Sequence, residues 1–394
     1  MAVEELLQEP PDFSLVLGGP LYQMFRRAHL TGAALELLRR RVIFFWLLCW
    51  VPLAVLSLAE GHFLGGARFS FLRDVETQVR FLISLPVLIL AEVVVHRRLR
   101  PVVKRFIERR IVSREEIREF YAMVDSTIRM RNSVIAEIVL LVLVFTGGIW
   151  IWRSEVALDV ASWYAAPQGG QMHLTRAGFW FAFVSVPVFQ FILLRWYMRM
   201  LLWFLFLIRV SRLRLQLMPA HPDRAGGLGF MGGSTIAFTP FLFAQGALLA
   251  GQIANRIFYK GQPLLSFKLT VVGFVGFFVA AILAPLLVFT PQLDLAKREG
   301  SAEYGALASE YVMDFNQKWL RRKANDERLL GSADIQSLAD LGNSFAVVRE
   351  MRVVPFATGD VLRLLVAALI PLVPLLLTIM PLEELVTDAI KFVI

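Results

Sequence analysis

Two arginines lie inside a long apolar stretch of the chain, where a charged side chain is costly. Arg195 and Arg199 stand four residues apart in FAFVSVPVFQFILLRWYMRMLLWFLFLI, so on a helix they share one face. An arginine near the middle of a bilayer costs about 3 kcal/mol on insertion scales, and it therefore needs a partner or water. Glu92 and Glu137 lie in two other apolar stretches and are the candidate partners. These four residues predict either an ion-pair cluster that holds helices together or a polar pathway.

The balance of charge and the nearby amide side chains help to distinguish an ion-pair cluster from a polar pathway. A fixed excess of positive charge in a pathway favours anions, but two arginines against two glutamates give no excess and leave proton coupling open. The apolar segment 235–257 adds Gln245, Gln252 and Asn255, spaced so that one helix face could present all three to a path. Its small residues also favour close helix packing, in which case the amides would bond to neighbouring helices.

The segment 221–233, HPDRAGGLGFMGG, lies just before that apolar segment and is rich in glycine. Glycines expose backbone N–H groups and a helix start carries positive partial charge, so the loop could hold an anion. His221 and Asp223 could add a protonation switch to such a site or stabilise the turn. Alternatively the segment is a tight turn in which Asp223 bonds the backbone. Ser234 or Thr235 could cap the following helix. The candidate residues of this anion nest are His221, Asp223, Arg224, Gly226, Gly227, Gly229, Gly232 and Ser234.

Other chemistries lack their motifs. The G-x-G-x-x-G pattern at Gly227 has no strand before it, which argues against a dinucleotide site. One histidine and one aspartate are too few ligands for a metal, and one cysteine, Cys49, provides no disulfide framework. No catalytic constellation stands out either. We therefore predict no catalytic residue, no metal and no cofactor.

The elements that must carry the charged residues are transmembrane helices. Of the 394 residues 57% are hydrophobic, above the roughly 45–50% of soluble domains, and they gather in runs near bilayer length. We predict an all-α, polytopic helical membrane protein with about seven spans. The second is short and contains Pro86, and whether the second and the seventh cross fully is left open. The predicted spans are 42–59, 81–95, 134–152, 179–208, 235–257, 269–289 and 361–380.

Lys and Arg predict the orientation of the spans. With the N-terminus inside, the inner segments hold 30 of the 41 basic residues and the outer segments hold 9. Cytoplasmic loops carry the excess of basic residues in most membrane proteins, so we place the N-terminus in the cytoplasm. The basic residues then reflect membrane topology, and no nucleic-acid partner is predicted.

The chain divides into four predicted parts. These are a cytoplasmic or interfacial N-terminal segment (1–41), a six-span bundle (42–290), a cytoplasmic helical segment (291–360) and the last span with its tail (361–394).

The sequence also predicts local structure within three of these parts. The stretch SLVLGGPLYQMF near the N-terminus suits a segment lying on the inner leaflet. The bundle contains a cytoplasmic helical hairpin, 97–133, in which Ser113 marks a helix start. In 291–360, apolar residues recur at helical spacing, which predicts two amphipathic helices folded onto the cytoplasmic face, with Ser332 as an N-cap.

The combination of HPDRAGGLGF with SLVLGGPLYQ near the start and PLEELV near the end resembles an uncharacterised family of bacterial multi-pass inner-membrane proteins. The resemblance would span most of the chain, and it implies a location in the bacterial inner (plasma) membrane. It implies no activity and no functional residues.

The sequence favours a membrane channel or transporter. Anions are the first candidate because of the arginines, the helix start and the basic inner face, with the Gly-rich loop as a cytoplasmic vestibule. The expected partners are the lipid bilayer, ions or a small anionic solute, and further copies of the chain. Two alternatives remain: a membrane enzyme acting on a lipid phosphate, and a scaffold or signalling protein that works through its cytoplasmic helices.

Overall fold

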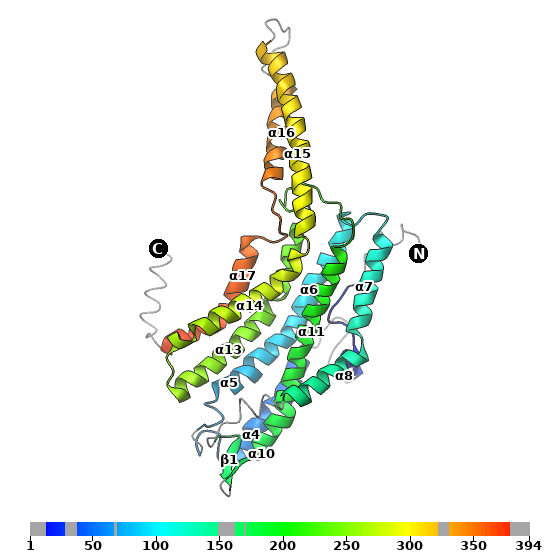
Figure 1. Ribbon diagram of the computed structural model, residues 1–394. Coiled ribbons are helices and arrows are strands. Elements are labelled where there is room, and N and C mark those ends of the chain that lie inside the picture. Colours follow the sequence, from blue (N-terminus) through cyan, green and yellow to red (C-terminus); the bar gives the residue numbers. More distant parts are fainter. Residues whose placement is uncertain are drawn as a thin grey trace.

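The fold consists almost entirely of helices (Figure 1). The computed structural model describes residues 13–27, 38–66, 69–148, 162–168, 171–321 and 331–378. Within these residues one small antiparallel hairpin pairs β1 (Ala165–Gln168) with β2 (Gln171–Leu174). The predicted class, an all-α polytopic membrane protein, is confirmed.

Five helical segments are long and apolar enough to cross a membrane, and a sixth candidate consists of two helices bent by 41°. The five are Leu38–Ala59 (α3, Leu38–Cys49, and α4, Val51–Ala59), Val75–Glu108 (α5, Val75–Gln78, and α6, Leu85–Glu108), Arg176–Val210 (α10, Arg176–Trp180, and α11, Val186–Val210), Leu264–Leu287 (with α14, Lys268–Leu287) and Thr358–Thr378 (with α17, Thr358–Leu369). The bent pair joins Gly229–Ala237 (with α12, Gly232–Ala237) to Thr239–Lys260 (α13).

The second and third predicted spans differ from the observed helices in ways that affect whether they cross a membrane. The second, predicted as 81–95, belongs to a continuous helical segment of 34 residues, because the charged stretch that follows the apolar run stays helical. The third, predicted as 134–152, corresponds to a shorter apolar helix, Val134–Gly147, which includes α8 (Val134–Leu143). Residues 149–152 of that prediction lie outside the described residues.

Two of the long segments contain a widened helical turn that ends two residues before a proline. The π-helical turn η1 (Val79–Ser84) precedes Pro86, and η4 (Phe181–Ser185) precedes Pro187. Proline has no backbone N–H and its ring crowds the preceding turn, and a wider turn relieves both constraints. Pro86 therefore does not end the second span.

The segment predicted as a helical hairpin, 97–133, is mostly helical. It consists of the end of α6 and of α7 (Ile117–Arg131), which returns along α11. The prediction that Ser113 starts the helix was wrong. Ser113 lies in a turn, where its carbonyl accepts from the N–H of Glu116 at 3.1 Å, and the helix begins at Ile117.

The second predicted pair of helices stands away from the body of the protein. In Figure 1, α15 (Thr290–Phe315) and α16 (Ala333–Arg349) run beside each other and project from one end of the bundle. The expectation that they fold onto the cytoplasmic face was wrong, because their inner faces pack against each other. Ser332 caps α16 as predicted, accepting from the N–H of Asp334 at 3.1 Å.

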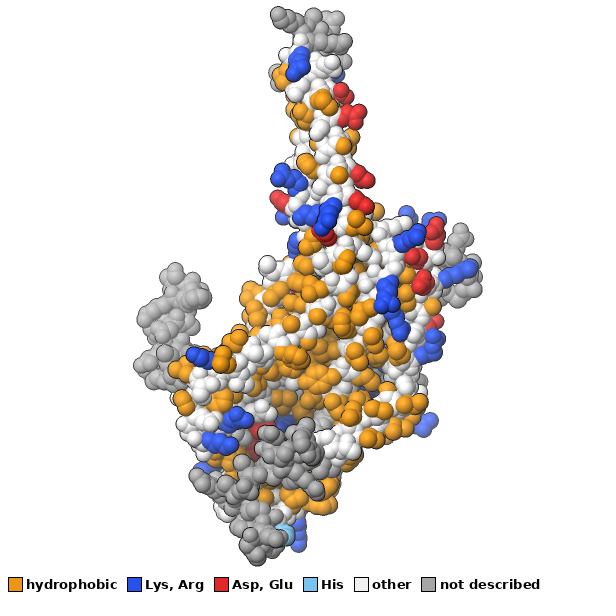
Figure 2. All heavy atoms as spheres, in the orientation of Figure 1, with side chains coloured by type: hydrophobic (Ala, Val, Ile, Leu, Met, Phe, Trp, Pro, Cys, Tyr) orange, Lys and Arg blue, Asp and Glu red, His pale blue; other side chains and the backbone are white. Residues whose placement is uncertain are grey.

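Apolar side chains cover the outside of the bundle. On the face shown in Figure 2 they extend over the body, whereas charged side chains gather on the projecting hairpin and toward the ends of the bundle. Leu269 and Val272 on α14 are 77% and 68% exposed, and Ile135 on α8 is 75% exposed. Surfaces of this kind are stable against lipid tails.

Close helix contact at a glycine is a feature of α13. A Cβ atom at Gly246 would collide with the carbonyl oxygen of Ala368 on α17 and would lie 3.3 Å from Cγ of Pro371. Small residues let helix backbones approach in this way. This contact supports close packing as a role for the small residues of α13.

We expect Gly246→Ala to lower the thermal stability of the detergent-purified protein, because the added methyl group forces α13 and α17 apart. Overpacking of this kind typically costs about 1–3 kcal/mol. Gly273→Ala on α14 is the matched control, since nothing lies within 4 Å of a Cβ there. Equal melting temperatures for the two variants would contradict the prediction.

Candidate functional site

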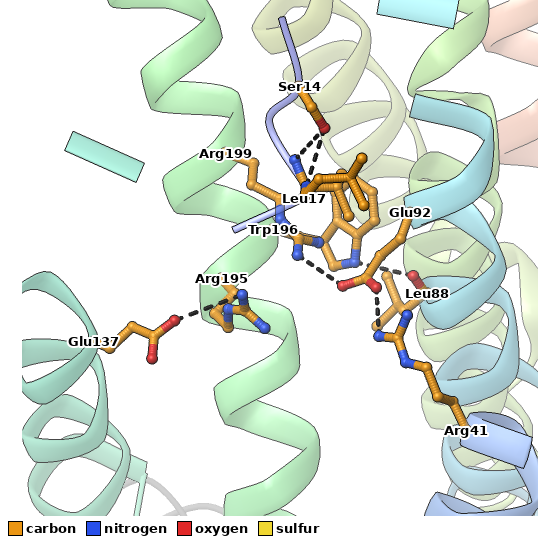
Figure 3. A network of polar contacts seen from close by, with 10 residues as sticks. Ser14, Leu17, Arg41, Leu88, Glu92, Glu137, Arg195, Trp196 and Arg199 are labelled. Atoms are coloured by element: carbon orange, nitrogen blue, oxygen red, sulfur yellow. Dashed lines mark hydrogen bonds and ion pairs between the residues drawn. The ribbon is translucent and has the colours of Figure 1, made fainter. Parts of the chain in front are cut away.

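The predicted intramembrane ion pairs form inside the bundle (Figure 3). Glu92 on α6 accepts from Nη2 of Arg199 on α11, at 2.7 Å through its Oε1 atom. Its other oxygen, Oε2, accepts from Nη2 of Arg41 on α3. One carboxylate therefore binds two guanidinium groups and joins three helices.

A second ion pair lies beside the first. Nη2 of Arg195 is 3.6 Å from Oε1 of Glu137 on α8. The guanidinium of Arg199 lies over the Trp196 ring at 4.8 Å from its centroid, and the indole N–H of Trp196 donates to the Leu88 carbonyl at 3.2 Å. A cation over an aromatic face gains electrostatic attraction, so Arg199 is held by both a carboxylate and a ring.

The sequence analysis did not anticipate two arginines of this cluster. Arg41 binds Glu92 directly, and Arg131 at the end of α7 is buried alongside. Both had been counted as basic residues flanking apolar runs. Their position immediately before such a run was the signal available: Arg41 directly precedes the first span and Arg131 lies three residues before Val134.

The cluster is deeply buried and carries more positive than negative charge. None of its six charged residues is more than 8% exposed. The cations are Arg41, Arg131, Arg195 and Arg199, and the anions are Glu92 and Glu137. Four guanidinium groups are therefore buried with two carboxylates, whereas the sequence had indicated equal numbers of the two.

An irregular stretch of backbone, residues 13–19, enters the bundle beside the cluster. Phe13 is fully buried, with ring centroids 6.1 Å from Trp203 and 5.0 Å from Phe206 on α11. The Ser14 carbonyl accepts from Nη1 of Arg131. The expectation that this stretch lies on the inner leaflet was wrong, because its apolar side chains are buried among helices.

Because residues 13–19 are buried without forming a helix, their backbone N–H groups need hydrogen-bond acceptors nearby. The Ser14 hydroxyl accepts from the N–H groups of Val16 at 3.2 Å and Leu17 at 3.0 Å, and it lies 3.0 Å from Nδ1 of His96 on α6. Irregular backbone is tolerated at membrane depth only where protein buries it or where it lines a water-filled cavity. Residues 13–19 are of the buried kind.

The three predicted amide residues of α13 do not share one environment. Gln245 is buried, and its Nε2 atom has no hydrogen-bond partner among the described residues. Gln252 is exposed. Asn255 donates to Asp74 at 2.9 Å, and Asp74 also accepts from the indole N–H of Trp163 at 3.0 Å. Of these three side chains, the buried polar atoms left without a partner among the described residues are therefore Nε2 of Gln245 and Oδ1 of Asn255, whereas Gln252 faces outward.

In the Gly-rich loop, the Asp223 carboxylate accepts hydrogen bonds from three backbone N–H groups. Oδ1 accepts from the N–H groups of Ala225 at 2.8 Å and Gly227 at 3.1 Å, and Oδ2 accepts from Gly229 at 2.8 Å. Nδ1 of His221 lies 3.0 Å from Oδ1. This geometry supports the tight turn, since a bound anion would need the donors that the chain's own carboxylate uses.

Burial raises the pKa of the Asp223 carboxyl, but the backbone donors and the neighbouring His221 lower it by more. The result is a pKa below the usual range. Hydrogen bonds to a carboxylate favour its charged form, and here they prevail over desolvation.

The same loop anchors the projecting hairpin. The Arg224 carbonyl accepts from the N–H of Arg352 at 2.7 Å, and the Arg224 side chain pairs with Glu350 at 2.9 Å. A Cβ at Gly226, where φ is +62°, would lie 3.0 Å from the Met351 side chain. The absence of a side chain at Gly226 therefore leaves room for Met351, which follows the end of α16.

The predicted capping of the next helix was wrong. The hydroxyls of Ser234 and Thr235 bond back to the carbonyls of Met231 and Gly232, each at 2.7 Å, and both residues lie within α12. Gly232 packs directly against Asp360 at the start of α17. The glycine is required there because a side chain would displace that carboxylate.

Within the described residues, no group of three or more His, Cys, Asp or Glu side chains is placed to hold a metal ion. No protein-family model, curated protein or solved structure matches the chain. The buried cluster is therefore the feature of this chain that indicates a function.

We expect Glu92→Gln to destabilise the protein strongly, because two buried guanidinium groups lose their shared carboxylate. Breaking a buried pair by removing one partner typically costs about 3–5 kcal/mol. Thermal unfolding in detergent measures the effect, with Glu303→Gln on the exposed surface of α15 as the control. A melting temperature equal to that of the control would show that Glu92 does not hold the helices.

We expect Asp223→Asn to speed backbone hydrogen exchange at Ala225, Gly227 and Gly229 at neutral pH, because a charged acceptor is lost. Since the folded-state pKa is lowered, the carboxylate stabilises the loop above its unfolded pKa of about 3.9, and this stabilisation is lost as pH falls through the lower folded-state value. Wild-type protection, corrected for intrinsic rates, should therefore fall in acid.

Asp314→Asn on the exposed surface of α15 is the control for the loop variant. Unchanged exchange in Asp223→Asn would mean that the carboxylate does not organise the turn.

Proposed function

We propose that this protein is a membrane channel or transporter with a preference for anions, working in the bacterial inner membrane with its N-terminus in the cytoplasm. The observation that carries the proposal is the buried cluster of four guanidinium groups and two carboxylates. An unbalanced positive charge in a low-dielectric interior is costly unless an anion or water accompanies it. An anion passing through or binding there would supply the missing charge.

The arrangement of the cluster supports a site and not only a clamp. Glu92 binds both Arg41 and Arg199, and Glu137 faces Arg195, so the two carboxylates are already engaged. The Nε atom of Arg195 is buried without a hydrogen-bond partner among the described residues. A donor of this kind is an available ligand for an anion.

The loop at 221–232 enters the proposal as the wall of a cytoplasmic vestibule. Arg212, Arg214 and Arg224 are exposed on or next to it, and surface arginines raise the local concentration of anions. Its backbone N–H groups contribute no further binding while Asp223 occupies them.

A scaffold function is the second candidate, and the projecting hairpin is the observation that favours it. Leu307 and Met313 are 51% and 64% exposed, and they belong to α15, which projects from the bundle in Figure 1. If the hairpin carries the function, its removal abolishes activity in cells, whereas a folded Arg199→Gln variant remains active.

Ion flux into liposomes that hold purified protein tests the main proposal, with chloride and potassium gradients compared. We expect Arg195→Gln and Arg199→Gln to reduce the preference for chloride roughly tenfold, which corresponds to about 1.4 kcal/mol of lost stabilisation of the anion. Arg298→Gln is the control, because that side chain is 76% exposed on the hairpin.

Each variant must first be shown to be folded, by size-exclusion chromatography in detergent. A wild-type chloride preference that survives both cluster substitutions would contradict the assignment of the pathway to this cluster.

A further inference from the structure

We propose that residues 13–19 form a displaceable plug that occupies a binding site for a small inorganic anion at Arg131. The inference deepens the proposed function, since the site adjoins the cluster assigned to the pathway. In the structure, a backbone carbonyl from the plug takes the place that the anion would have.

Arg131 is the cation of this site. It is 8% exposed, and its guanidinium donates to the Ser14 carbonyl and, at 3.0 Å, to Oδ1 of Asn132. Both partners are neutral, and Arg131 makes no ion pair with any described residue. Of the four arginines, it is therefore the one whose charge a carboxylate does not balance directly.

Two glycines let the plug lie against this cation. Gly18 and Gly19 have φ values of +146° and +90°, which disfavour other residues. A Cβ at Gly18 would collide with the Arg131 guanidinium, and a Cβ at Gly19 would lie 3.1 Å from Oε1 of Glu137. The plug thus passes between Arg131 and the carboxylate that faces Arg195.

The plug touches helices on several sides. Phe13 packs on α11, Ser14 contacts α6 through His96 and α7 through Arg131, and Gly19 approaches α8 through Glu137. A segment that enters among four helices without being a helix itself fills space that a ligand could otherwise reach.

The contacts that hold the plug suit withdrawal. Residues 13–19 contribute no charged side chain and no ion pair. Those contacts that are described consist of aromatic packing at Phe13, buried Leu15 and Val16, the Ser14 hydroxyl beside His96, and the neutral Ser14 carbonyl, which accepts from the Arg131 guanidinium. Withdrawal of the Ser14 carbonyl leaves the Arg131 guanidinium facing the vacated space without that acceptor. A singly charged anion restores its pairing, while the nearby Glu137 carboxylate disfavours anions of higher charge.

Accessibility and anion binding can be measured separately from transport. The accessibility reporter is Leu15→Cys, which is 1% exposed in the wild type, in a Cys49→Ala background that removes the chain's one cysteine. A membrane-impermeant maleimide reports its exposure. Chloride binding is measured as the rise in melting temperature when chloride replaces gluconate.

Gly18→Ala is the opening variant, because its methyl group clashes with Arg131. We expect labelling of the reporter to rise about tenfold, as for a minor open state that becomes the main one. We also expect chloride to raise the melting temperature of this variant more than that of the wild type. Adding Arg131→Gln should abolish the chloride effect. Gly61→Ala is the control: it has a φ of +75° but no atom within 4 Å of its Cβ.

Faster labelling without chloride stabilisation, or stabilisation that survives Arg131→Gln, would overturn the anion site. If Gly18→Ala labels at the wild-type rate, deletion of residues 1–19 exposes Arg131 directly. Absence of chloride stabilisation in that variant would overturn the inference as well.

Chloride flux in the same preparations tests the proposed function independently. Stabilisation that depends on Arg131 without any flux would refute transport and leave the site in place. Flux without such stabilisation would refute the site and leave transport in place.

Discussion

The carboxylate of Glu92, bound by Arg199 and Arg41, is the contact on which the arrangement of the bundle depends. Between apolar helices in lipid, the hydrophobic effect provides little preference for one register over another, so packing and polar contacts decide. A carboxylate that must meet two guanidinium groups permits one relative position of α3, α6 and α11. The cost of burying three charges is offset only in that position.

The excess of arginine in the same region sets the second constraint. Four guanidinium groups cannot all be balanced by two carboxylates, and the chain supplies neutral acceptors to Arg131, which pairs with neither carboxylate. This accounts for the irregular backbone at residues 13–19, where a helix would have no free carbonyl to offer. The Ser14 hydroxyl satisfies the amides that this departure from helical structure would leave unpaired.

The sequence predicted the helical membrane class, and it singled out Arg195, Arg199, Glu92 and Glu137 as possible partners without assigning the pairs, because charged residues are rare inside apolar runs. Arg41 and Arg131 were missed since a basic residue before such a run resembles a topology signal. The seven-residue spacing of Gln245 and Gln252 predicted that both side chains face the interior, but only Gln245 is buried. Spacing places residues on one side of a helix, whereas the neighbouring helices decide which part of that side is covered. The buried plug depends on tertiary contacts that no local pattern records.

The two places that the sequence analysis and the structure nominate for an anion are both filled by the chain itself, but with different chemistry. In the Gly-rich loop the occupant is the Asp223 carboxylate, which is charged and receives three backbone donors. At Arg131 the occupant is a neutral carbonyl of residue 14. A charged occupant with matched donors resists replacement, whereas a neutral one beside a buried cation leaves the electrostatic demand unmet. The difference in charge makes the loop a structural element and Arg131 the stronger candidate for exchange with a ligand.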